Sequence, residues 1–558
     1  MKFFACGVLL IALISATTAS DMSPPSITLA IVNARVWTGN PRAPWATAIA
    51  ASGDRIAGVG STAEIAKLAR GSGARMVDAR GGMVVPGFID SHVHFVDAGF
   101  RLALVQLRDA RTPEEFVARI KAYAAGLAAG TWITGGDWDH QQWGGELPSR
   151  EWIDSVTPNN PVWISRLDGH MALANTAAMR AAKVTRATPE VEGGTIMRHP
   201  NGEPTGIFKD NAEGLIGRVE PPQTAQMNDR ALRSAMHYVA ARGVTSVQNM
   251  GTFADLATFE RAHHSGALIT RIYAVTPIAQ WEQLRDTVAA RGRGDEWLRI
   301  GGVKGFVDGS LGSHTAAMFA PFSDSPADSG FLVETPDDLY RWTKGADKAG
   351  LQVLVHAIGD RAIDLQLGIF ERVARENGPR DRRFRIEHAQ HLRPADIPRF
   401  ARDGVIPSMQ PYHAIDDGRW AEKVIGPERA KTTYAFRSLR DAGARIAFGS
   451  DWYVAPPTPL DGIYAAVTRR TLDGRNPDGW VPAQKITVED ALRAYTVNAA
   501  FASFDEGIKG TLVRGKLADL VLIDRDLTTV PPETIRDAKI LLTVVGGKIV
   551  YEAGAPGS

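Results

Sequence analysis

The chain has 558 residues, of which 44% are hydrophobic and 22% are charged. This composition is typical of a globular protein and excludes a disordered chain. The length accommodates a barrel of roughly 200 to over 400 residues with a smaller domain, and it excludes a single small module. With 63 Lys and Arg against 62 Asp and Glu, the net charge is +1, so no overall field attracts nucleic acid or an anionic membrane. We therefore expect a small-molecule partner and no nucleic acid, and the sequence leaves open a homo-oligomer.

Residues 1–20 have the features of a secretory signal peptide. Lys2 precedes an apolar run from Phe3 to Ala16, and small residues follow, with cleavage expected near Ala19 or Ser20. The run is too short to span a bilayer comfortably, and no later run is long and apolar enough. We therefore predict an exported protein, periplasmic or secreted, without stable membrane insertion after cleavage. An uncleaved N-terminal anchor is the alternative.

The single cysteine, Cys6, lies within this N-terminal segment. The mature chain is therefore predicted to have no disulfide, no cysteine metal ligand and no cysteine nucleophile. Any metal ion must be held by histidine, by carboxylate or by an oxygen carried on a modified lysine.

Both ends of the chain contain short alternating strands bounded by Gly and Asp turns. Residues 27–85 contain runs such as 31–36, and residues 508–558 contain 518–523 and 540–550. This similarity predicts one composite β-sandwich domain built from 27–85 and 508–558.

Between the ends, residues 86–507 alternate short apolar runs with helical stretches. Eight such β/α units predict an α/β fold, a (β/α)8 TIM-type barrel. The stretch of approximately 100–230 after the first strand is too long for one crossover helix and contains strands of its own, so we expect an inserted lid domain. The eight candidate strands are 83–94, 245–250, 269–275, 300–307, 351–356, 383–388, 405–410 and 445–451.

Residue types that ligate metals stand at the ends of these strands. His92 and His94 are two residues apart, so their side chains point to the same side of the first strand. Alone this spacing is weak evidence, since either residue could be an ordinary structural histidine. His356, His388 and Asp451 end three other strands, and barrel enzymes assemble their sites at these carboxyl ends. Together the five residues predict one metal site.

Lys304 lies on the fourth candidate strand, and lysine is rarely buried without a partner. It could reach solvent or pair with Asp308. Alternatively, the deprotonated amine takes up CO2 as a carbamate whose oxygens bridge two metal ions. The second interpretation requires a second metal.

No serine-hydrolase elbow, His-Glu-x-x-His motif, P-loop or Rossmann fingerprint appears in the sequence. Instead, an ordered set of motifs resembles the amidohydrolase superfamily, specifically the amidohydrolase-3 branch that includes N-substituted formamide deformylase and YtcJ-like proteins. The resemblance covers nearly the whole mature chain. Its motifs are Pro86 to His94, Asp168 to His170, Val303 and Lys304 with Asp308 to Gly312, His356 to Asp360, Arg385 to His388, Ser408 to Pro411, Gly449 to Trp452, and Gly515 to Asp519.

The resemblance implies two divalent metal ions, with zinc expected, although the ligand types also suit iron, manganese or nickel. It places His92, His94 and Asp451 around one ion and His356 and His388 around the other. Carbamylated Lys304 would bridge the two ions, and a mononuclear variant stays open. The implied mechanism is attack by a metal-activated hydroxide. Asp451 would act first as general base and then as general acid.

The implied function is hydrolysis of a non-peptide C–N bond, of amide or formamide type, in a small molecule. The same dinuclear site could instead cleave an ester, lactone or phosphoester or deaminate a heterocycle, because an activated hydroxide attacks any suitably placed electrophile. A non-catalytic binding protein on this scaffold is an alternative from a different class.

Four further residues are candidates for substrate contact. His170, in the predicted insertion, could reach over the barrel mouth to hold substrate or stabilise an oxyanion, or it could be a structural loop histidine. Gln410, His413 and Trp452 follow the ends of strands seven and eight, where they could line the pocket or pack.

Overall fold

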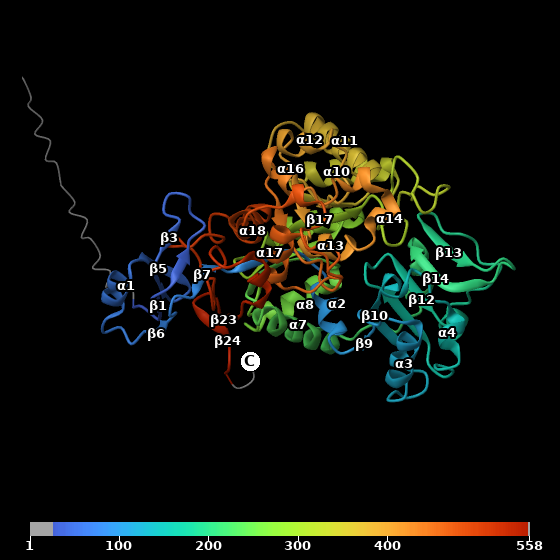
Figure 1. Ribbon diagram of the computed structural model, residues 1–558, viewed down its shortest axis with the longest axis horizontal. Helices are drawn as coiled ribbons and strands as arrows, with labels where there is room; N and C mark the ends of the chain where they lie inside the picture. The colour runs from blue at the N-terminus through green and yellow to red at the C-terminus, as the bar shows by residue number, and fades with distance from the viewer. Residues whose placement is uncertain (1–25, 556–558) are drawn as a thin grey trace, which may run out of the picture.

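The computed structural model describes residues 26–555, so the predicted signal peptide and Cys6 lie outside the described residues. Among the residues that it describes, none of the helices is both long enough and apolar enough to cross a membrane. The strands form four sheets, of which the largest is the central one (Figure 1).

The central sheet has eight strands, and every pairing between neighbours is parallel. This arrangement confirms the predicted TIM-type barrel. In barrel order the strands are β8 (Phe88–Val93), β15 (Val244–Met250), β16 (Arg271–Pro277), β17 (Leu298–Phe306), β18 (Gln352–Ala357), β19 (Arg385–His388), β20 (Ile406–Met409) and β21 (Ala447–Phe448).

Hydrogen bonds between the first and last barrel segments close the sheet. The amide of His94 donates to the carbonyl of Trp452, and the amide of Asp451 donates to the carbonyl of His92, both at 2.7 Å. Val93 forms a parallel bridge with Trp452. Closure of the barrel therefore brings three predicted metal ligands together.

The predicted first strand, 83–94, is wrong as a single element. It divides into β7 (Met83–Pro86), which pairs with β2 and β22 outside the barrel, and β8. Pro86 has no amide hydrogen, so it cannot donate a hydrogen bond within a central strand of the barrel sheet. At Gly87 a Cβ atom would lie 2.2 Å from Thr245 Oγ1, so only glycine fits where the chain passes from one sheet to the other.

Helices cover the outside of the barrel (Figure 1). In α10 (Pro336–Lys348) the Thr335 side chain caps the first turn by accepting a hydrogen bond from the Asp338 amide, and Pro336 occupies the first turn. The other helices that follow barrel strands are α2 (Phe95–Arg101), α7 (Ala225–Ala240), α8 (Phe253–His264), α9 (Trp281–Arg291), α11 (Asp360–Asn377), α12 (Ile397–Arg402), α13 (Pro411–Asp417), α14 (Ala421–Ile425), α15 (Pro427–Ala430), α16 (Phe436–Asp441), α17 (Pro459–Thr468), α18 (Val488–Tyr495) and α19 (Val497–Ala502).

Two sheets beside the barrel contain the described ends of the chain, and one of them combines both ends (Figure 1). Its order is β24-β23-β22-β7-β2-β3, and we call it the terminal sheet. Apolar side chains of the two sheets share one core. The strands are β1 (Leu29–Val32), β2 (Arg35–Trp37), β3 (Trp45–Ala46), β4 (Ala48–Ser52), β5 (Arg55–Gly60), β6 (Arg75–Asp78), β22 (Leu520–Ile523), β23 (Ile540–Val545) and β24 (Lys548–Glu552), with helix α1 (Thr62–Ala69).

A fourth sheet, which we call the insert sheet, lies between α2 and α7 in the sequence and beside the barrel in space (Figure 1). It has two apolar cores of its own. Its order is β13 (Gly194–Arg198), β14 (Pro204–Asp210), β12 (Met171–Ala174), β11 (Val162–Arg166), β10 (Ile133–Trp138) and β9 (Val105–Gln106), with helices α3 (Pro113–Ala124), α4 (Arg150–Asp154), α5 (Thr176–Ala181) and α6 (Gly214–Gly217).

Candidate metal centre

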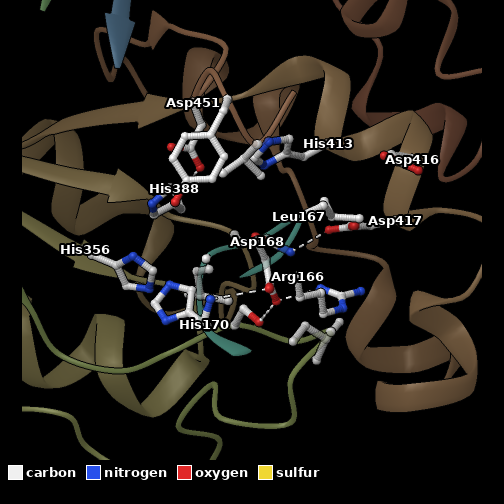
Figure 2. A pocket seen from close by; sticks show the side chains of 18 of the residues that line it. Arg166, Leu167, Asp168, His170, His356, His388, His413, Asp416, Asp417 and Asp451 are labelled. Carbon is white, nitrogen blue, oxygen red and sulfur yellow. Dashed lines mark hydrogen bonds and ion pairs between the residues drawn. The ribbon is translucent and has the colours of Figure 1, made fainter. Parts of the chain in front are cut away.

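A cavity of about 150 Å³ lies at the carboxyl ends of the barrel strands. Its wall combines barrel residues with a loop of the insert sheet and with α13 (Figure 2). Eight of the residues singled out in the sequence line it together: His92, His94, His170, Lys304, His356, His388, His413 and Asp451.

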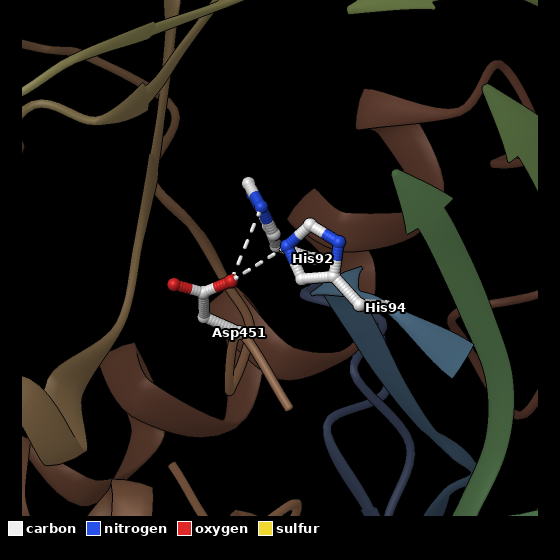
Figure 3. A group of neighbouring side chains, drawn as sticks. All are labelled: His92, His94 and Asp451. Carbon is white, nitrogen blue, oxygen red and sulfur yellow. Dashed lines mark ion pairs between the residues drawn. The ribbon is translucent and has the colours of Figure 1, made fainter. Parts of the chain in front are cut away.

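Three of these residues form a compact group of metal-ligand atoms (Figure 3). Asp451 Oδ1 lies 3.4 Å from His92 Nε2 and 3.2 Å from His94 Nε2. His92 Nε2 is buried and has no hydrogen-bond partner among residues 26–555. A buried imidazole nitrogen without a partner beside a carboxylate suits a divalent cation, so the residues fit the predicted metal.

A second group shares Asp451 and adds His388 and His413 from α13, with donor atoms within 4.8 Å of one another. His413 Nε2 is also buried without a hydrogen-bond partner in the described chain. The rings of His356 and His388 lie 4.5 Å apart, but His356 Nε2 is 3.0 Å from the carbonyl of Gly309, which leaves Nδ1 for a metal. His413, predicted to contact substrate, is therefore also a candidate ligand.

Buried partners orient the ligand rings. His92 Nδ1 lies 2.6 Å from Glu387 Oε2, and Arg385 Nε donates to the other oxygen of Glu387 at 2.8 Å. His388 Nδ1 lies 2.9 Å from Gln410 Oε1. A hydrogen bond on one ring nitrogen fixes the tautomer, so the other nitrogen is free to bind metal.

Burial controls the protonation of the site. It lowers the pKa of the His92, His356 and His388 imidazoles, and nearby cationic groups lower it further. Burial alone would raise the pKa of Asp451, but His92 and His94 hold it below its usual range. Neutral imidazoles beside an ionised carboxylate are the protonation states that metal binding requires.

Lys304 is 5% exposed, and burial lowers the pKa of its amine to about 8. It forms no ion pair with any residue of the described chain. Asp308, the partner considered in the sequence, instead accepts hydrogen bonds from three backbone amides, those of Ala317, Ile358 and Gly359. Lys304 thus faces the cavity as a buried amine that lies 4.6 Å from the centroid of the Phe306 ring, with no carboxylate of residues 26–555 at ion-pair distance.

Two predicted substrate contacts do not line the cavity. Gln410 lies behind His388, and the Trp452 ring stacks on Tyr238 of α7 with 5.0 Å between centroids. The backbone of Trp452 is held by the barrel closure, and its side chain packs against α2 and α7. The adjacent Tyr453 lines the cavity instead. The side chains of Gln410 and Trp452 therefore lie outside the cavity lining, and their direct contact with substrate stays a prediction.

Sequence reasoning missed several carboxylates that support the site. Asp90 accepts hydrogen bonds from the Ser450 amide and hydroxyl, which ties β8 to the chain after β21. Glu387 lies within a motif already noted, where a carboxylate inside a candidate barrel strand was the available signal. Asp308 was considered only as a partner of Lys304. Asp210, at the end of β14, had no such signal.

A closed parallel barrel with imidazole and carboxylate donors at the carboxyl ends of its strands defines a metal-dependent barrel enzyme. The sequence profile of the amidohydrolase family, in its amidohydrolase-3 form, matches residues 75–551. The chain belongs to the amidohydrolase family of metal-dependent hydrolases, which confirms the resemblance drawn from the motifs.

Three similar proteins cover most of the chain. The chain is 41% identical to Protein LONG AFTER FAR-RED 3 of Arabidopsis thaliana, covering 96% of this chain and 94% of that protein. It is 30% identical to N-substituted formamide deformylase of Arthrobacter pascens, covering 94% and 98%. The crystal structure of an uncharacterized metal-dependent hydrolase from Pyrococcus horikoshii superposes with a TM-score of 0.74 at 30% identity, covering 90% and 99%.

Proposed function

We propose that this protein hydrolyses a non-peptide C–N bond, of amide or formamide type, in a small molecule. The observation that carries the proposal is the group formed by His92, His94 and Asp451, in which the buried Nε2 of His92 has no hydrogen-bond partner among the described residues. The similarity to N-substituted formamide deformylase over nearly the whole chain supports the choice of bond.

The chain offers positions for two divalent ions, for which zinc is the expected metal. His92, His94 and Asp451 would hold one ion, and His388 with His356 or His413 would hold the other. We propose that Lys304 is carboxylated and contributes to both. A buried amine with its pKa lowered to about 8 supports this, because only the neutral amine reacts with CO2. When bound, the ions supply Lewis-acid activation of water and of the substrate carbonyl.

The protein residues supply orientation and proton transfer. Asp451 projects into the cavity beside His94, so its carboxylate can take a proton from water and deliver it to the leaving nitrogen. Glu387 and Gln410 hold the rings of His92 and His388. These contacts keep the donor atoms in place before substrate arrives, which lowers the cost of reorganisation during the reaction.

The test is elemental analysis combined with rate measurements on purified enzyme. Initial rates are compared on N-alkylformamides, N-acyl amines, and ester and phosphoester analogues of the same size. We expect bound divalent metal and turnover of the formyl or acyl amides. Turnover of phosphoesters alone, or substrate retention without metal or product, contradicts the proposal.

Variants locate the site. His92→Ala and Asp451→Ala should lower turnover by more than about 100-fold, since loss of even a supporting partner of a metal ligand costs about 10- to 100-fold. The matched controls are His264→Ala and Asp286→Ala, which change exposed side chains outside the cavity. Normal activity of a metal-loaded His92→Ala variant would show that the site is elsewhere.

Export to the periplasm or medium is part of the proposal and rests on residues 1–20. N-terminal sequencing of protein from cell fractions tests it. A mature N-terminus near residue 20 in the exported fraction is expected, and an intact N-terminus in the cytosol contradicts it.

A further inference from the structure

The insert sheet places a histidine and an aspartate side by side at the mouth of the barrel. Strands β12 and β14 are antiparallel, with Met171 paired to Lys209. The next positions along this ladder are His170 and Asp210, whose backbones are linked by a hydrogen bond of 3.3 Å. Their side chains also meet, with 2.6 Å between His170 Nδ1 and Asp210 Oδ1. Residues directly opposite on paired strands are expected to interact in this way.

The histidine of this pair faces the candidate metal centre. His170 lines the cavity, where it lies next to His356 (Figure 2). The centroids of the two rings are 4.9 Å apart. Since Nδ1 is occupied by Asp210, the nitrogen left for a ligand is Nε2, which has no hydrogen bond to any residue between 26 and 555. The pair therefore presents an unused ring nitrogen to the site.

Asp210 is held in an unfavourable environment in order to make this contact. Its side chain is 2% exposed, its Oδ2 has no hydrogen-bond partner in the described chain, and its backbone has a φ of +47°. A left-handed conformation at a residue other than glycine, and a buried carboxylate oxygen without a donor, both cost free energy. Such costs are concentrated at functional sites.

Contacts with the barrel fix the pair over the cavity. A Cβ atom at Gly309, in the loop after β17, would lie 1.9 Å from Thr315 Oγ1 and 2.9 Å from Asp210 Oδ1, so glycine leaves room for both side chains beside the barrel. Lys209 donates to the carbonyl of Ser313 at 2.7 Å, and Asp168 accepts from the Ser313 hydroxyl at 2.9 Å. The position of His170 is thus set by two elements at once, the insert sheet and the loop after β17.

We propose that Asp210 is a positioning residue that orients His170, and that His170 Nε2 forms a hydrogen bond with the amide group undergoing cleavage. The insert sheet then supplies a catalytic side chain as well as part of the cavity wall. This inference rests on the proposed function, because the bond that His170 contacts is the one that the metal centre cleaves.

A double-mutant cycle tests the coupling between the two residues. His170→Gln, Asp210→Asn and the double variant are compared on N-butylformamide, or on the best amide from the substrate panel. Each single variant should lower kcat by about tenfold or more, as loss of a partner that orients an active-site histidine does, with a smaller change in KM. If Asp210 acts through His170, the double variant is no slower than His170→Gln alone. Multiplying effects, or normal kcat in Asp210→Asn, overturn the proposal.

The matched control is Asp154→Asn. Asp154 also accepts a backbone amide and a hydroxyl within the same inserted region, from Thr176, but it does not line the cavity. We expect this variant to change Tm without changing kcat, in the wild-type and His170→Gln backgrounds alike. An equal loss of kcat in Asp154→Asn would assign the effect of Asp210→Asn to the stability of the sheet.

A second readout needs neither substrate nor metal. In proton NMR of the metal-free protein, the ring proton shared by His170 and Asp210 should resonate downfield of the backbone amides, and the signal should disappear in His170→Gln and Asp210→Asn alike. The signal of the His92–Glu387 pair, also 2.6 Å long, should remain. If both downfield signals persist in Asp210→Asn, the pairing of His170 with Asp210 is refuted. If the signals behave as expected but no amide substrate is turned over, only the proposed function is refuted.

Discussion

At the scale of single residues, buried histidines outside the metal centre make stability depend on pH. His391 is 2% exposed, its Nδ1 contacts the Thr433 hydroxyl at 2.9 Å, and its Nε2 has no partner within the described residues. Burial, with a smaller contribution from Arg429, lowers the pKa of His391 to about 3. The folded protein therefore keeps this imidazole neutral at pH values where the unfolded chain protonates it.

The sign of the effect follows from which state binds the proton. Above the unfolded pKa of 6.5 neither state is protonated, and the stability is complete. As pH falls from 6.5 towards 3, only the unfolded state gains a proton, so stability is lost. Because of His391, the free energy of unfolding of the wild type should fall by about 2 kcal/mol between pH 7.5 and pH 5, at about 1.4 kcal/mol per pH unit below 6.5. We predict that His391→Gln removes this loss. Thermal unfolding at both pH values measures this, with the exposed His264→Gln as control. Parallel curves for wild type and His391→Gln would contradict it.

At the scale of elements, the sequence located the strand ends well because an apolar run followed by a polar ligand marks where each barrel strand ends. It could not separate β7 from β8, since both are apolar and only their distant partners, β22 and β15, distinguish them. It also could not pair His170 with Asp210, because that contact depends on the register of two strands about 40 residues apart. Residue types were predictable, and long-range pairing was not.

The junction between β8 and the chain after β21 should be sensitive to very small changes. At Gly449 a Cβ atom would lie 2.6 Å from the amide nitrogen of His92 and 2.9 Å from Asp90 Oδ1. Backbone that is itself hydrogen-bonded cannot move away cheaply. We predict that Gly449→Ala destabilises the protein by about 1–3 kcal/mol, as overpacking does, and weakens metal binding through displacement of His92.

Tm and metal content after dialysis check this prediction. Gly368→Ala is the control, because that glycine lies within α11 with no atom within 4 Å of an added Cβ, and alanine is favoured over glycine there by about 1 kcal/mol. The two substitutions add the same methyl group and should have opposite effects on Tm. Full metal content in Gly449→Ala with lowered Tm would show that the junction serves the fold and not the site.

At the scale of the whole molecule, a buried ion pair joins the barrel to the terminal sheet. Arg271 of β16 binds Asp519 through two hydrogen bonds, 2.7 Å from Nε and 3.1 Å from Nη2, and both side chains are at most 4% exposed. Asp519 also accepts a hydrogen bond from the Gly546 amide in the turn between β23 and β24. Asp519 was part of a sequence motif, and its structural role is to hold the C-terminal strands against the barrel.

Loss of one partner in such a pair should affect the whole protein. Asp519→Ala leaves the Arg271 guanidinium buried without its carboxylate, which costs about 3–5 kcal/mol, whereas replacing both partners by apolar residues costs less. We therefore predict a large fall in Tm for Asp519→Ala, partial recovery in Arg271→Met with Asp519→Leu, and a single unfolding transition in each case. Asp524→Ala, which removes a more exposed pair with Arg525 in the same region, should cost at most about 1 kcal/mol. The ion pair joins the terminal sheet to the barrel. If thermal unfolding instead showed two separate transitions and only one of them shifted, the terminal sheet would unfold independently of the barrel.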